Sequence, residues 1–384
     1  MGETGVQPGL KMALVQDALP FFGGAERVLV QARRVFPRAQ LYTLIHRPSA
    51  FAGTPLEGVP ARASFLNRLP GAQRYHRLFF PLYPRAVESL DLREFDLVLS
   101  FSYAAAHGAR TRPGQLHLAL FYTPLRLAYH ESHPLAQGSG VRARLLQRAL
   151  GGFRRWDAAA AARPDALLAV SAWVARLARG LYGRPVGVLY PPVETGRFRP
   201  APAREAFYLA VSRLEPHKRL DLVVEAFNRL NRPLLVVGEG SQRARLERAA
   251  RPNVRFLGRL ADPEAARLFE RARALVHAGE EDFGISLVEA QAAGCPVIAY
   301  AGGGAGETVL PGRTGLFFPE QSAGSLAEAV AEFERCEAGF RPGALRAWAG
   351  RFSAGRFRRE LAQAVRAVCE GRLPGGEDEP QRRA

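Results

Sequence analysis

The stretch Gly279-Glu-Glu-Asp-Phe-Gly-Ile-Ser-Leu-Val-Glu-Ala-Gln-Ala-Ala-Gly-Cys-Pro-Val-Ile-Ala says more about the fold than any other part of this 384-residue sequence. An apolar run before it, 274–277, predicts a strand, and its residues 283–293 repeat apolar side chains at helical spacing. A second apolar run, 296–300, predicts the next strand. Strand, loop, helix and strand in this order predict a parallel α/β unit.

Two acids in this stretch are candidate ligand-binding residues. Glu281 follows the carboxyl end of the first strand, where open α/β sheets bind their ligands. Glu289 lies about two turns along the helix. The spacing alone is typical of a surface acid and a helix-face salt-bridge partner, so the interpretation depends on the position between two strands.

Strands and helical patterns alternate along the whole chain in two series. The expected strands of the first series are 12–16, 40–45, 96–100, 116–122, 166–170 and 186–189, and those of the second are 207–211, 234–237, 254–257, 275–277, 297–300 and 316–317. Helical patterns at 25–36 and 141–162 are the clearest between strands. The sequence therefore predicts an α/β protein with two doubly wound parallel-sheet domains that face each other across a cleft.

The ordered motifs of the chain resemble those of the retaining family-4 glycosyltransferases. The hallmark of that family is Glu, seven residues, Glu, with Phe-Gly shortly after the first acid and the second acid in a Glu-Ala pair, and each element is present here. Further landmarks occur in order over roughly residues 11–366: Gly23-Gly24-Ala25-Glu26-Arg27, Thr123-Pro124-Leu125-Arg126, Arg155-Trp156-Asp157, Tyr190-Pro191-Pro192-Val193, Val211-Ser212-Arg213-Leu214 with Lys218, Gly238-Glu239-Gly240, and Gly302-Gly303-Gly304-Ala305-Gly306-Glu307-Thr308. The sequence resembles in particular the mannosyltransferase-like branch that builds bacterial surface polysaccharides.

The resemblance implies the GT-B fold, with two Rossmann-like domains. We expect an acceptor-binding domain at 10–192 and a nucleotide-sugar-binding domain at 203–352, joined by a proline-rich hinge. A helix at 353–371 is expected to return to the first domain, as is common in the family. The polar tail 372–384 is expected to be disordered.

Arg213 and Lys218 are candidate diphosphate ligands. Both lie in the loop after the expected strand 207–211, before a helix expected to open near His217, and a helix N-terminus with fixed cations suits a diphosphate. Solvated cations are the alternative for an arginine-rich chain. Lys218 stands out because the chain has only one other lysine, Lys11. The family places its diphosphate clamp on these two positions.

Glycines after two further strands indicate close backbone approach to a ligand. Gly238 follows the strand 234–237, where an ordinary tight turn is the alternative, and Gly303 and Gly304 lead into a short helix. By resemblance, this second loop holds donor sugar and phosphate. The backbone near Arg259 and Leu260 is the expected contact of the nucleotide base.

The resemblance divides the two acids by role. Glu281 contacts the hydroxyls of the transferred sugar, and Glu289 holds the ribose of the nucleotide. A carboxylate suits both roles because it accepts hydrogen bonds from two hydroxyls. Phe283, Gly284 and Ile285, which lie between the acids, are also expected to line the nucleotide site.

In the first domain, Gly23 and Gly24 open the helix 25–36, and their amides are candidates to face the diphosphate or the acceptor, with a plain glycine turn as the alternative. Tyr122 departs from the family, which commonly has histidine just before Thr-Pro. It is a candidate catalytic residue that keeps the backbone geometry and supplies a hydroxyl.

Three histidines are alternative substitutes for the one that the family has near the reacting sugar. They are His107, His117 and His130. A single histidine is more often structural, so the sequence does not choose between them and Tyr122.

The resemblance implies a retaining reaction in which the leaving diphosphate helps to deprotonate the acceptor. Such an enzyme needs neither a protein nucleophile nor a metal, and we expect no cofactor. The expected donor is GDP-mannose, favoured over UDP-sugars, and the expected acceptor is a lipid-linked glycan or a polysaccharide. A nucleotide-sugar epimerase or phosphorylase on the same fold is the first alternative, which the absence of an evident cofactor lysine disfavours.

Composition limits the remaining function classes. The three cysteines are scattered, and no apolar run reaches the ~20 residues of a membrane span. We therefore expect a cytosolic protein, either in solution or bound peripherally to the inner face of the membrane.

Net charge is +17, and residues 1–195 hold 24 basic and 12 acidic side chains. This excess indicates a polyanionic partner such as an anionic membrane. A non-enzymatic membrane- or nucleic-acid-binding protein is the second alternative, but no nucleic-acid motif is present.

Two segments could form the membrane contact. One is an apolar stripe at helical spacing, surrounded by arginines and without an acid between Glu131 and Asp157: Leu145, Leu146, Ala149, Leu150, Phe153 and Trp156, with Arg142, Arg144, Arg148, Arg154 and Arg155. The other is Arg74-Tyr75-His76-Arg77-Leu78-Phe79-Phe80. A stripe that faces the core, with a solvated arginine face, is the alternative for both.

Overall fold

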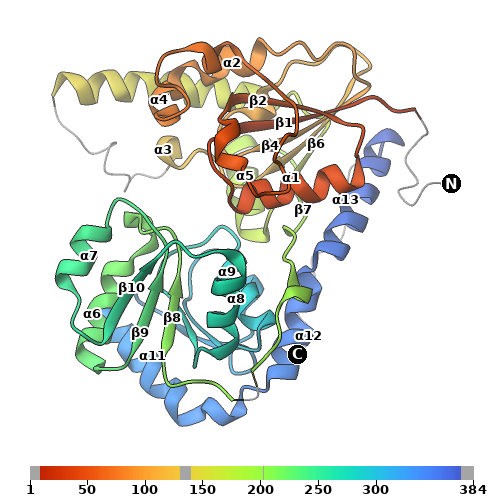
Figure 1. Cartoon of the computed structure of the whole chain (residues 1–384). Helices are drawn as coiled ribbons and strands as arrows, with labels where there is room; N and C mark the ends of the chain where they lie inside the picture. Colours follow the sequence, from red (N-terminus) through yellow and green to blue (C-terminus); the bar gives the residue numbers. More distant parts are fainter. Residues whose placement is uncertain (1–8, 130–139, 202, 373–384) are drawn as a thin grey trace. The chain divides into compact units, whose positions relative to one another are not determined.

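The computed structural model describes residues 9–129, 140–201 and 203–372, and it divides into two compact units. Unit 2 is Pro191–Arg356, and unit 1 contains the described residues before it together with those from Phe357 onward (Figure 1). Each unit has a parallel sheet and a hydrophobic core of its own. The predicted fold class, two doubly wound parallel-sheet α/β units, is confirmed.

The sheet of unit 1 has seven strands in the order β3-β2-β1-β4-β5-β6-β7, all parallel. They are β1 (Met12–Leu19), β2 (Gln40–His46), β3 (Ala61–Ala63), β4 (Leu97–Ser102), β5 (Leu116–Phe121), β6 (Ala166–Ala169) and β7 (Gly187–Val188). Every residue of β1 and β4 is buried. Helices cover both faces of such a sheet, so its central strands are buried along their whole length and are mainly apolar.

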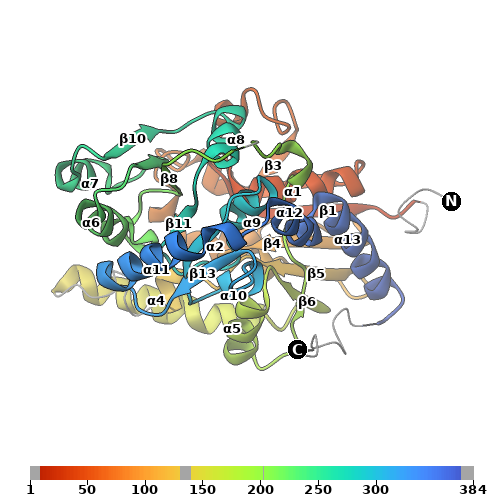
Figure 2. The ribbon, with the colours of Figure 1, turned by 90° about the horizontal axis from the view of Figure 1, so that it is seen from below.

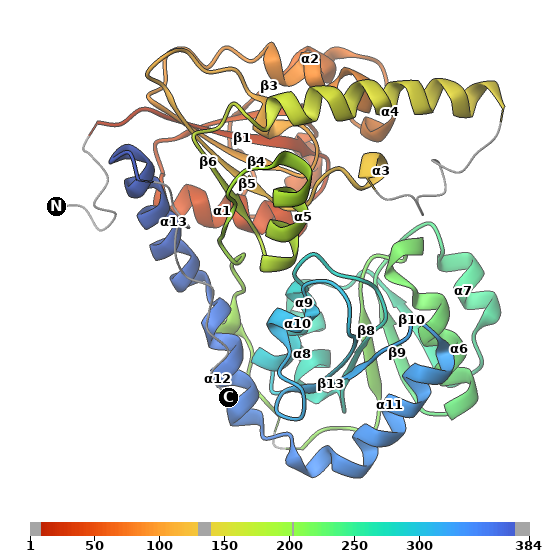
Figure 3. The ribbon, with the colours of Figure 1, turned by 180° about the vertical axis from the view of Figure 1, so that it is seen from behind.

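Unit 1 has helices between these strands and one further helix that follows unit 2 in the chain. They are α1 (Gly24–Val35), α2 (Tyr83–Glu88), α3 (Arg126–Tyr129), α4 (Val141–Ala160), α5 (Ala172–Tyr182) and α13 (Ala354–Cys369), with 3-10 turns at Pro48–Phe51, Phe65–Arg68, His76–Leu82 and Ala106–Gly108. From Phe357 onward α13 belongs to unit 1, where it lies beside α1 (Figure 3). Nη1 of Arg358 donates to Oε1 of Gln31 on α1 at 2.6 Å.

The sheet of unit 2 has six parallel strands in the order β10-β9-β8-β11-β12-β13. They are β8 (Tyr208–Val211), β9 (Leu234–Val237), β10 (Val254–Gly258), β11 (Leu275–His277), β12 (Val297–Tyr300) and β13 (Gly315–Phe318). The strand order reverses between β8 and β11, and an open α/β sheet binds ligands at the carboxyl ends of the strands at such a point. Lys218 follows β8 and Glu281 follows β11, so the fold brings the two loops that carry them together.

The described residues of unit 2 form seven helices around this second sheet. They are α6 (Leu220–Leu230), α7 (Arg243–Ala249), α8 (Asp262–Arg271), α9 (Ile285–Ala292), α10 (Ala305–Thr308), α11 (Ala323–Cys336) and α12 (Pro342–Ala349), with 3-10 turns at Thr195–Arg197, Pro216–Lys218, Glu337–Gly339 and Gly350–Phe352. In the view of Figure 2, α12 packs against α9, the helix that carries Glu289. None of the described helices in either unit has both the length and the apolar character to span a bilayer.

The predicted strands occur at their expected places, but one strand was missed and one expected helix start was wrong. The sequence did not predict β3, which has three residues at the sheet edge and no apolar run. The helix expected to open near His217 begins instead at Leu220, after a 3-10 turn. Arg219 separates turn and helix with φ of 51°, a left-handed conformation that non-glycine residues adopt at a cost.

Candidate active site

Loops at the carboxyl end of the second sheet approach one another closely, backbone to backbone. Only glycine permits such close approach. A Cβ on Gly238 would lie 1.9 Å from the carbonyl oxygen of Ser212, and one on Gly240 would lie 2.4 Å from that of Leu214. The loop after β9 therefore rests directly on the loop after β8. The close approach that the sequence predicts at Gly238 is made here to a neighbouring loop.

The loops after β11 and β12 are joined in the same way. Gly304 donates its N–H to the carbonyl oxygen of Glu281 at 2.7 Å, and a Cβ on Gly303 would lie 2.3 Å from that same oxygen. On the other side, a Cβ on Gly279 would lie 3.0 Å from Cα of Lys218. These contacts fix the backbone of Glu281 between the β8 loop and the glycine loop that follows β12.

The side chains of Lys218, His277 and Glu281 form a largely buried polar cluster between these loops. Nζ of Lys218 donates to Oε1 of Glu281 at 2.5 Å, and Nε2 of His277 lies 2.8 Å from the same oxygen. Only 12% of the Lys218 side chain and 15% of the Glu281 side chain are exposed. The cluster thus combines an ammonium group and a carboxylate at the position where the fold predicts a ligand.

The pKa of Glu281 is set by two opposing effects. Burial alone would raise it, because a charged carboxylate loses solvation, but the charges of Lys218 and His277 lower it. The net result is a pKa well below the usual value for glutamate. Glu281 is therefore ionised near neutral pH and can accept hydrogen bonds from hydroxyl groups.

Glu289 lies on α9 and is held by an arginine from the first turn of unit 2. Nη2 of Arg197 donates to Oε1 of Glu289 at 2.6 Å, and Nη1 of Arg197 lies 3.2 Å from Oδ2 of Asp262 at the start of α8. The guanidinium also lies over the ring of Phe198, with Cζ 4.6 Å from the ring centre. Glu289 thus pairs with Arg197, whereas Glu281 pairs with Lys218, so the two acids have separate basic partners.

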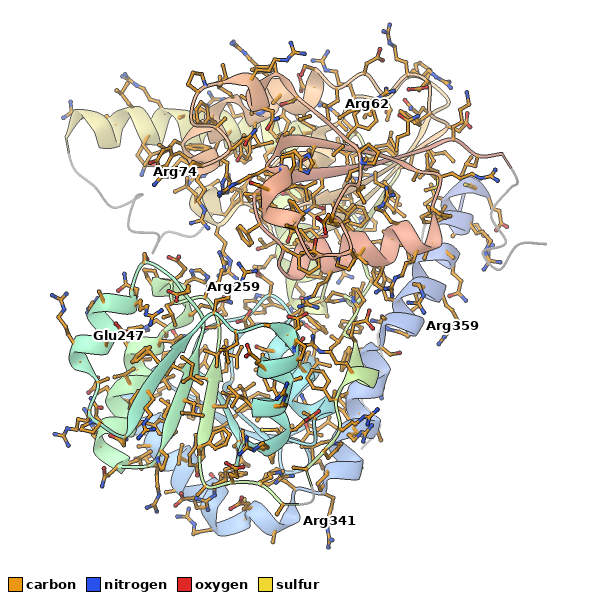
Figure 4. The ribbon with its side chains drawn as sticks, viewed as in Figure 1. Arg62, Arg74, Glu247, Arg259, Arg341 and Arg359 are labelled. Carbon is orange, nitrogen blue, oxygen red and sulfur yellow. The ribbon has the colours of Figure 1, made fainter. Side chains whose placement is uncertain are left out.

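Three other predicted residues lie around the same end of the sheet. Arg213 is exposed in the β8 loop, and Arg259 is exposed directly after β10 (Figure 4). Leu260 follows it and is half-buried. Their positions allow contact with a ligand that extends from the switch point toward β10.

The residues between the two acids have different surroundings from one another. Phe283 is buried and packs edge-on against Phe352, with ring centres 5.4 Å apart, so its side chain supports the loop from the core. Gly284 caps α9 with φ of 92°, and a Cβ there would meet the side chain of Leu287. Ile285 is the first residue of α9 and is half-buried.

In unit 1, the predicted residues Gly23, Gly24 and Tyr122 lie at the start of α1. Gly23 is the N-cap, and its N–H donates to Oε2 of Glu26 at 2.9 Å. The hydroxyl of Tyr122 donates to the carbonyl oxygen of Ala25 at 3.0 Å. Burial raises the pKa of Tyr122 well above its usual value, so the hydroxyl stays protonated and holds the first turn of the helix.

The histidines considered as substitutes lie inside unit 1. His107 is buried, with Nδ1 2.9 Å from Oγ of Ser102 and Nε2 3.2 Å from Oδ1 of Asp157. His117 is buried too, its Nε2 lies 2.8 Å from Oγ of Ser100, and burial lowers its pKa to about 3. His130 lies outside the described residues. The two described histidines therefore act as interior polar groups of this unit.

Sequence reasoning missed His277 and Arg197 as members of the site. His277 was assigned only as the last residue of a strand, although a histidine four residues before a candidate acid was a usable signal. Arg197 gave no signal, because 92 residues separate it from its partner on α9. Within the described part of the chain, no group of three or more His, Cys, Asp and Glu side chains is placed to hold a metal ion.

Residues 194–346, most of unit 2, match the family model described as glycosyl transferases group 1. The chain therefore carries a group 1 glycosyl transferase domain, and its resemblance to mannosyltransferase-like proteins of GT-B fold is confirmed.

Among curated proteins, the chain is 36% identical over 174 residues to a GDP-mannose-dependent alpha-(1-6)-phosphatidylinositol monomannoside mannosyltransferase of Mycobacterium tuberculosis, an alignment that covers 38% of this chain and 45% of that protein. It is also 36% identical over 151 residues to a glycogen synthase of the same organism, which covers 36% of each chain. The matches thus span less than half the length of these relatives.

Solved structures match over nearly the whole chain but at low sequence identity. A sucrose-phosphate synthase from Thermosynechococcus elongatus aligns with a TM-score of 0.74 at 18% identity, covering 94% of this chain and 100% of that one. HepE of Anabaena in complex with UDP aligns with a TM-score of 0.69 at 17% identity, covering 93% and 100%. At such identities the similarity establishes the fold alone.

Proposed function

We propose that this protein is a retaining glycosyltransferase that transfers a hexose from a nucleoside diphosphate sugar to a lipid-linked or polysaccharide acceptor. The observation that carries the proposal is the buried cluster of Lys218, His277 and Glu281 at the switch point of a sheet whose unit matches a glycosyl transferase family. It offers a cation for phosphate and an ionised acid for sugar hydroxyls in one place.

Each group in the site has a role in this reaction. Lys218 and Arg213 bind the donor diphosphate and stabilise the negative charge that develops on it as the sugar leaves. Glu281 orients the sugar through its hydroxyls, and Glu289 holds the ribose. The glycine loop at Gly303 approaches the sugar and phosphate.

The base contacts are assigned to the backbone near Arg259 and Leu260. Both follow β10, next to β9 in the sheet order, and a base can reach them while its diphosphate lies at the β8 loop. Backbone donors and acceptors at this place select the base, which the phosphate and ribose contacts do not distinguish.

We propose mannose as the sugar and GDP as the nucleotide. The support is sequence similarity to two proteins whose names state GDP-mannose dependence, at 36% and 37% identity. HepE, which shares only the fold, was solved with UDP. UDP-sugars are therefore the competitors to test.

In the proposed mechanism, attack and departure occur on the same face of the sugar. The acceptor hydroxyl loses its proton to the leaving diphosphate as the new glycosidic bond forms. The protein contributes by orienting donor and acceptor and by fixing positive charge at the diphosphate, since such preorganised charge lowers the barrier without rearrangement. Glu281 lies within an ion pair and acts here as a positioning acid.

We propose an acceptor carried on an anionic membrane, with unit 1 as the docking part. Leu78 and Leu145 are 76% and 59% exposed, and the 3-10 helix His76–Leu82 packs against α4 through Phe80 and Phe153. The two segments suggested by the sequence therefore adjoin one another. The rest of the stripe on α4 is largely internal, since Leu150 and Phe153 belong to the core.

Exposed basic side chains near these two leucines add positive charge to the same surface. Arg74, Arg77, Arg144 and Arg148 are exposed, and Arg74 is labelled in Figure 4. The side chain of Arg142 lies outside the described residues. Exposed leucines among arginines are typical of a surface that binds anionic lipid.

A donor screen followed by product analysis tests the proposed function. The purified full chain is heated with GDP-, UDP- and ADP-sugars, and a ligand at 100 times its dissociation constant adds about 2.7 kcal/mol of stability. The stabilising donor is then incubated with lipid-linked acceptors, and NMR of the product reports the anomeric configuration. Stabilisation by GDP-mannose and a product with the donor's configuration support the proposal. No stabilisation by any of these sugars, or an inverted product, contradicts it.

A further inference from the structure

We infer that Arg197 is a positioning residue for the nucleotide ribose: it fixes the carboxylate of Glu289 in the orientation that accepts the ribose hydroxyls. The inference rests on the proposed function, because it takes the ribose as the ligand of Glu289. It adds a residue that neither the sequence motifs nor the family match assign to the site.

The contact is formed between two elements of unit 2 that pack against each other. Arg197 ends the 3-10 turn Thr195–Arg197, which packs against α9, and Glu289 lies in the middle of that helix. Nη2 of Arg197 meets Oε1 of Glu289 at 2.6 Å. The side chains are 23% and 14% exposed, so water screens the pair only in part.

The guanidinium itself is held from two further sides. Asp262 meets Nη1 at 3.2 Å, and the ring of Phe198 lies under the guanidinium. Phe198 is fully buried against Phe269, with ring centres 6.0 Å apart. Arg197 therefore has two contacts besides Glu289, and these help to hold the guanidinium that orients that glutamate.

The chemistry of a carboxylate leaves room for a ligand beside this arginine. Each carboxylate oxygen has two lone pairs, so a carboxylate group has about four acceptor sites. The contact with Arg197 restricts the carboxylate plane of Glu289, and a carboxylate has more acceptor sites than this one contact uses. A carboxylate with a fixed plane can accept two hydrogen bonds from adjacent hydroxyls, which is the arrangement that a ribose presents.

A purely structural role accounts less well for this arginine. Its Nε is buried and has no hydrogen-bond partner among the described residues, which is a cost for the folded state. Replacing a buried ion pair by apolar side chains of similar volume is often neutral or stabilising. A role in orienting Glu289 therefore explains the presence of Arg197 better than a contribution to stability does.

The test is calorimetric titration of the full-length protein with GDP, 2′-deoxy-GDP, 3′-deoxy-GDP and inorganic pyrophosphate, repeated with the matching uridine compounds. The variants are Arg197→Met, Arg197→Lys and Glu289→Gln, and Arg199→Gln is the control, because Arg199 is an exposed arginine two residues away. Thermal unfolding of each variant shows whether it is folded.

We expect Arg197→Met to weaken binding of the ribonucleotide by roughly 10-fold, the loss of one charge-assisted contact. In the same variant, binding of pyrophosphate should hardly change. Binding of the deoxynucleotide that lacks the hydroxyl contacted by Glu289 should also hardly change. Combined with Glu289→Gln, the substitution should have no additional effect, since Arg197 acts through that acid. Arg197→Lys should recover part of the affinity.

Three outcomes overturn the inference and are distinguishable. If Glu289→Gln loses ribose discrimination and a folded Arg197→Met keeps it, Arg197 has no positioning role, while the proposed function stands. If Glu289→Gln discriminates ribose from deoxyribose as well as the unaltered protein does, then the ribose role of Glu289 fails and the inference fails with it. An equal loss for all four ligands in Arg197→Met also contradicts it, because it indicates a general disturbance of the site.

Discussion

Nζ of Lys218 lies 2.5 Å from Oε1 of Glu281, although Lys218 follows β8 and Glu281 follows β11, 63 residues later. The two residues proposed to bind different parts of the donor thus bind each other without it. A diphosphate that enters the site competes with Glu281 for the ammonium group, and a sugar hydroxyl competes with Lys218 for the carboxylate. We therefore expect donor affinity to depend on the balance between these contacts.

The first prediction concerns Lys218. Lys218→Ala should weaken nucleoside diphosphate binding by roughly 10- to 100-fold, since a hydrogen bond to a charged group contributes about 1.5–3 kcal/mol. Arg213→Ala should act in the same direction. Calorimetry measures the affinities, and Lys11→Ala, which removes the other lysine at an exposed position, is the control. An unchanged affinity in folded Lys218→Ala is incompatible with the diphosphate role.

The second prediction separates the two acids. Glu289→Ala should lose affinity for free nucleoside diphosphate, because the ribose contact is present in product and donor alike. Glu281→Ala should bind the free nucleotide at least as tightly as the unaltered protein does, because Lys218 then has no competing carboxylate, and should transfer sugar slowly, because the contact of Glu281 with the donor involves the sugar. Calorimetry and a transfer assay on both variants measure the two effects. Equal losses of nucleotide affinity in both would show that the roles are wrongly divided.

The sequence predicted the parts of the site that lie near strand ends. Lys218 and Glu281 were identified because each follows an apolar run with strand character, and the parallel order of the strands brings them together. β3 was missed because three residues at a sheet edge carry no apolar pattern. The start of α6 was misplaced because a 3-10 turn and a helix have similar sequence patterns.

Contacts between distant residues could not be predicted in this way. Arg197 and Glu289 are 92 residues apart, and Tyr122 and Ala25 are 97 apart. No local periodicity links such pairs. Gly238 shows a related limit, since its sequence indicates a close approach but not that Ser212 is the neighbour.

The third prediction follows from the depressed pKa of Glu281. A carboxyl group with a folded-state pKa well below the usual value of about 4.5 stabilises the protein above that value. The contribution falls as pH decreases below about 4.5 and is lost once pH passes the folded-state pKa. The difference in unfolding free energy between the unaltered protein and Glu281→Gln should therefore be constant near neutral pH and shrink below pH ~4.5.

Denaturant unfolding at a series of pH values measures this difference. Glu328→Gln, on the exposed side of α11, controls for the loss of one negative charge. A difference for Glu281→Gln that stays constant from neutral pH down to the onset of acid unfolding would contradict the assigned ion pair.

The fourth prediction concerns Tyr122, for which we propose a site role exerted through the first turn of α1. Tyr122→Phe removes the hydroxyl that donates to the carbonyl of Ala25, and the unfolding free energy should fall by about 0.5–1.5 kcal/mol. Chemical denaturation measures the change, with the exposed Tyr75→Phe as control. Sugar transfer should decrease only slightly, because Tyr122 holds backbone and not a reacting group. Full stability combined with loss of transfer would instead assign the hydroxyl a direct catalytic role.

The fifth prediction concerns the surface formed by the 3-10 helix His76–Leu82 and the start of α4. Basic residues near an anionic membrane contribute about 1 kcal/mol each, and salt screens that attraction over ~8–10 Å. Flotation with vesicles that contain phosphatidylglycerol should therefore show binding that falls steeply as salt rises. A variant with Arg74, Arg77, Arg144 and Arg148 replaced by glutamine should bind weakly, and Leu78→Ser should weaken binding at all salt concentrations because it removes apolar contact.

The matched control for this surface is Arg245→Gln with Arg248→Gln, which removes exposed positive charge from α7 in unit 2. If net charge alone attracts the protein, removal of a pair from either unit should weaken binding to the same degree. If unit 1 docks through the surface described, replacing Arg144 and Arg148 should have a clear effect and the α7 pair little. Equal recovery with phosphatidylcholine and phosphatidylglycerol vesicles would exclude an anionic docking surface and leave α4 as a helix of the domain core.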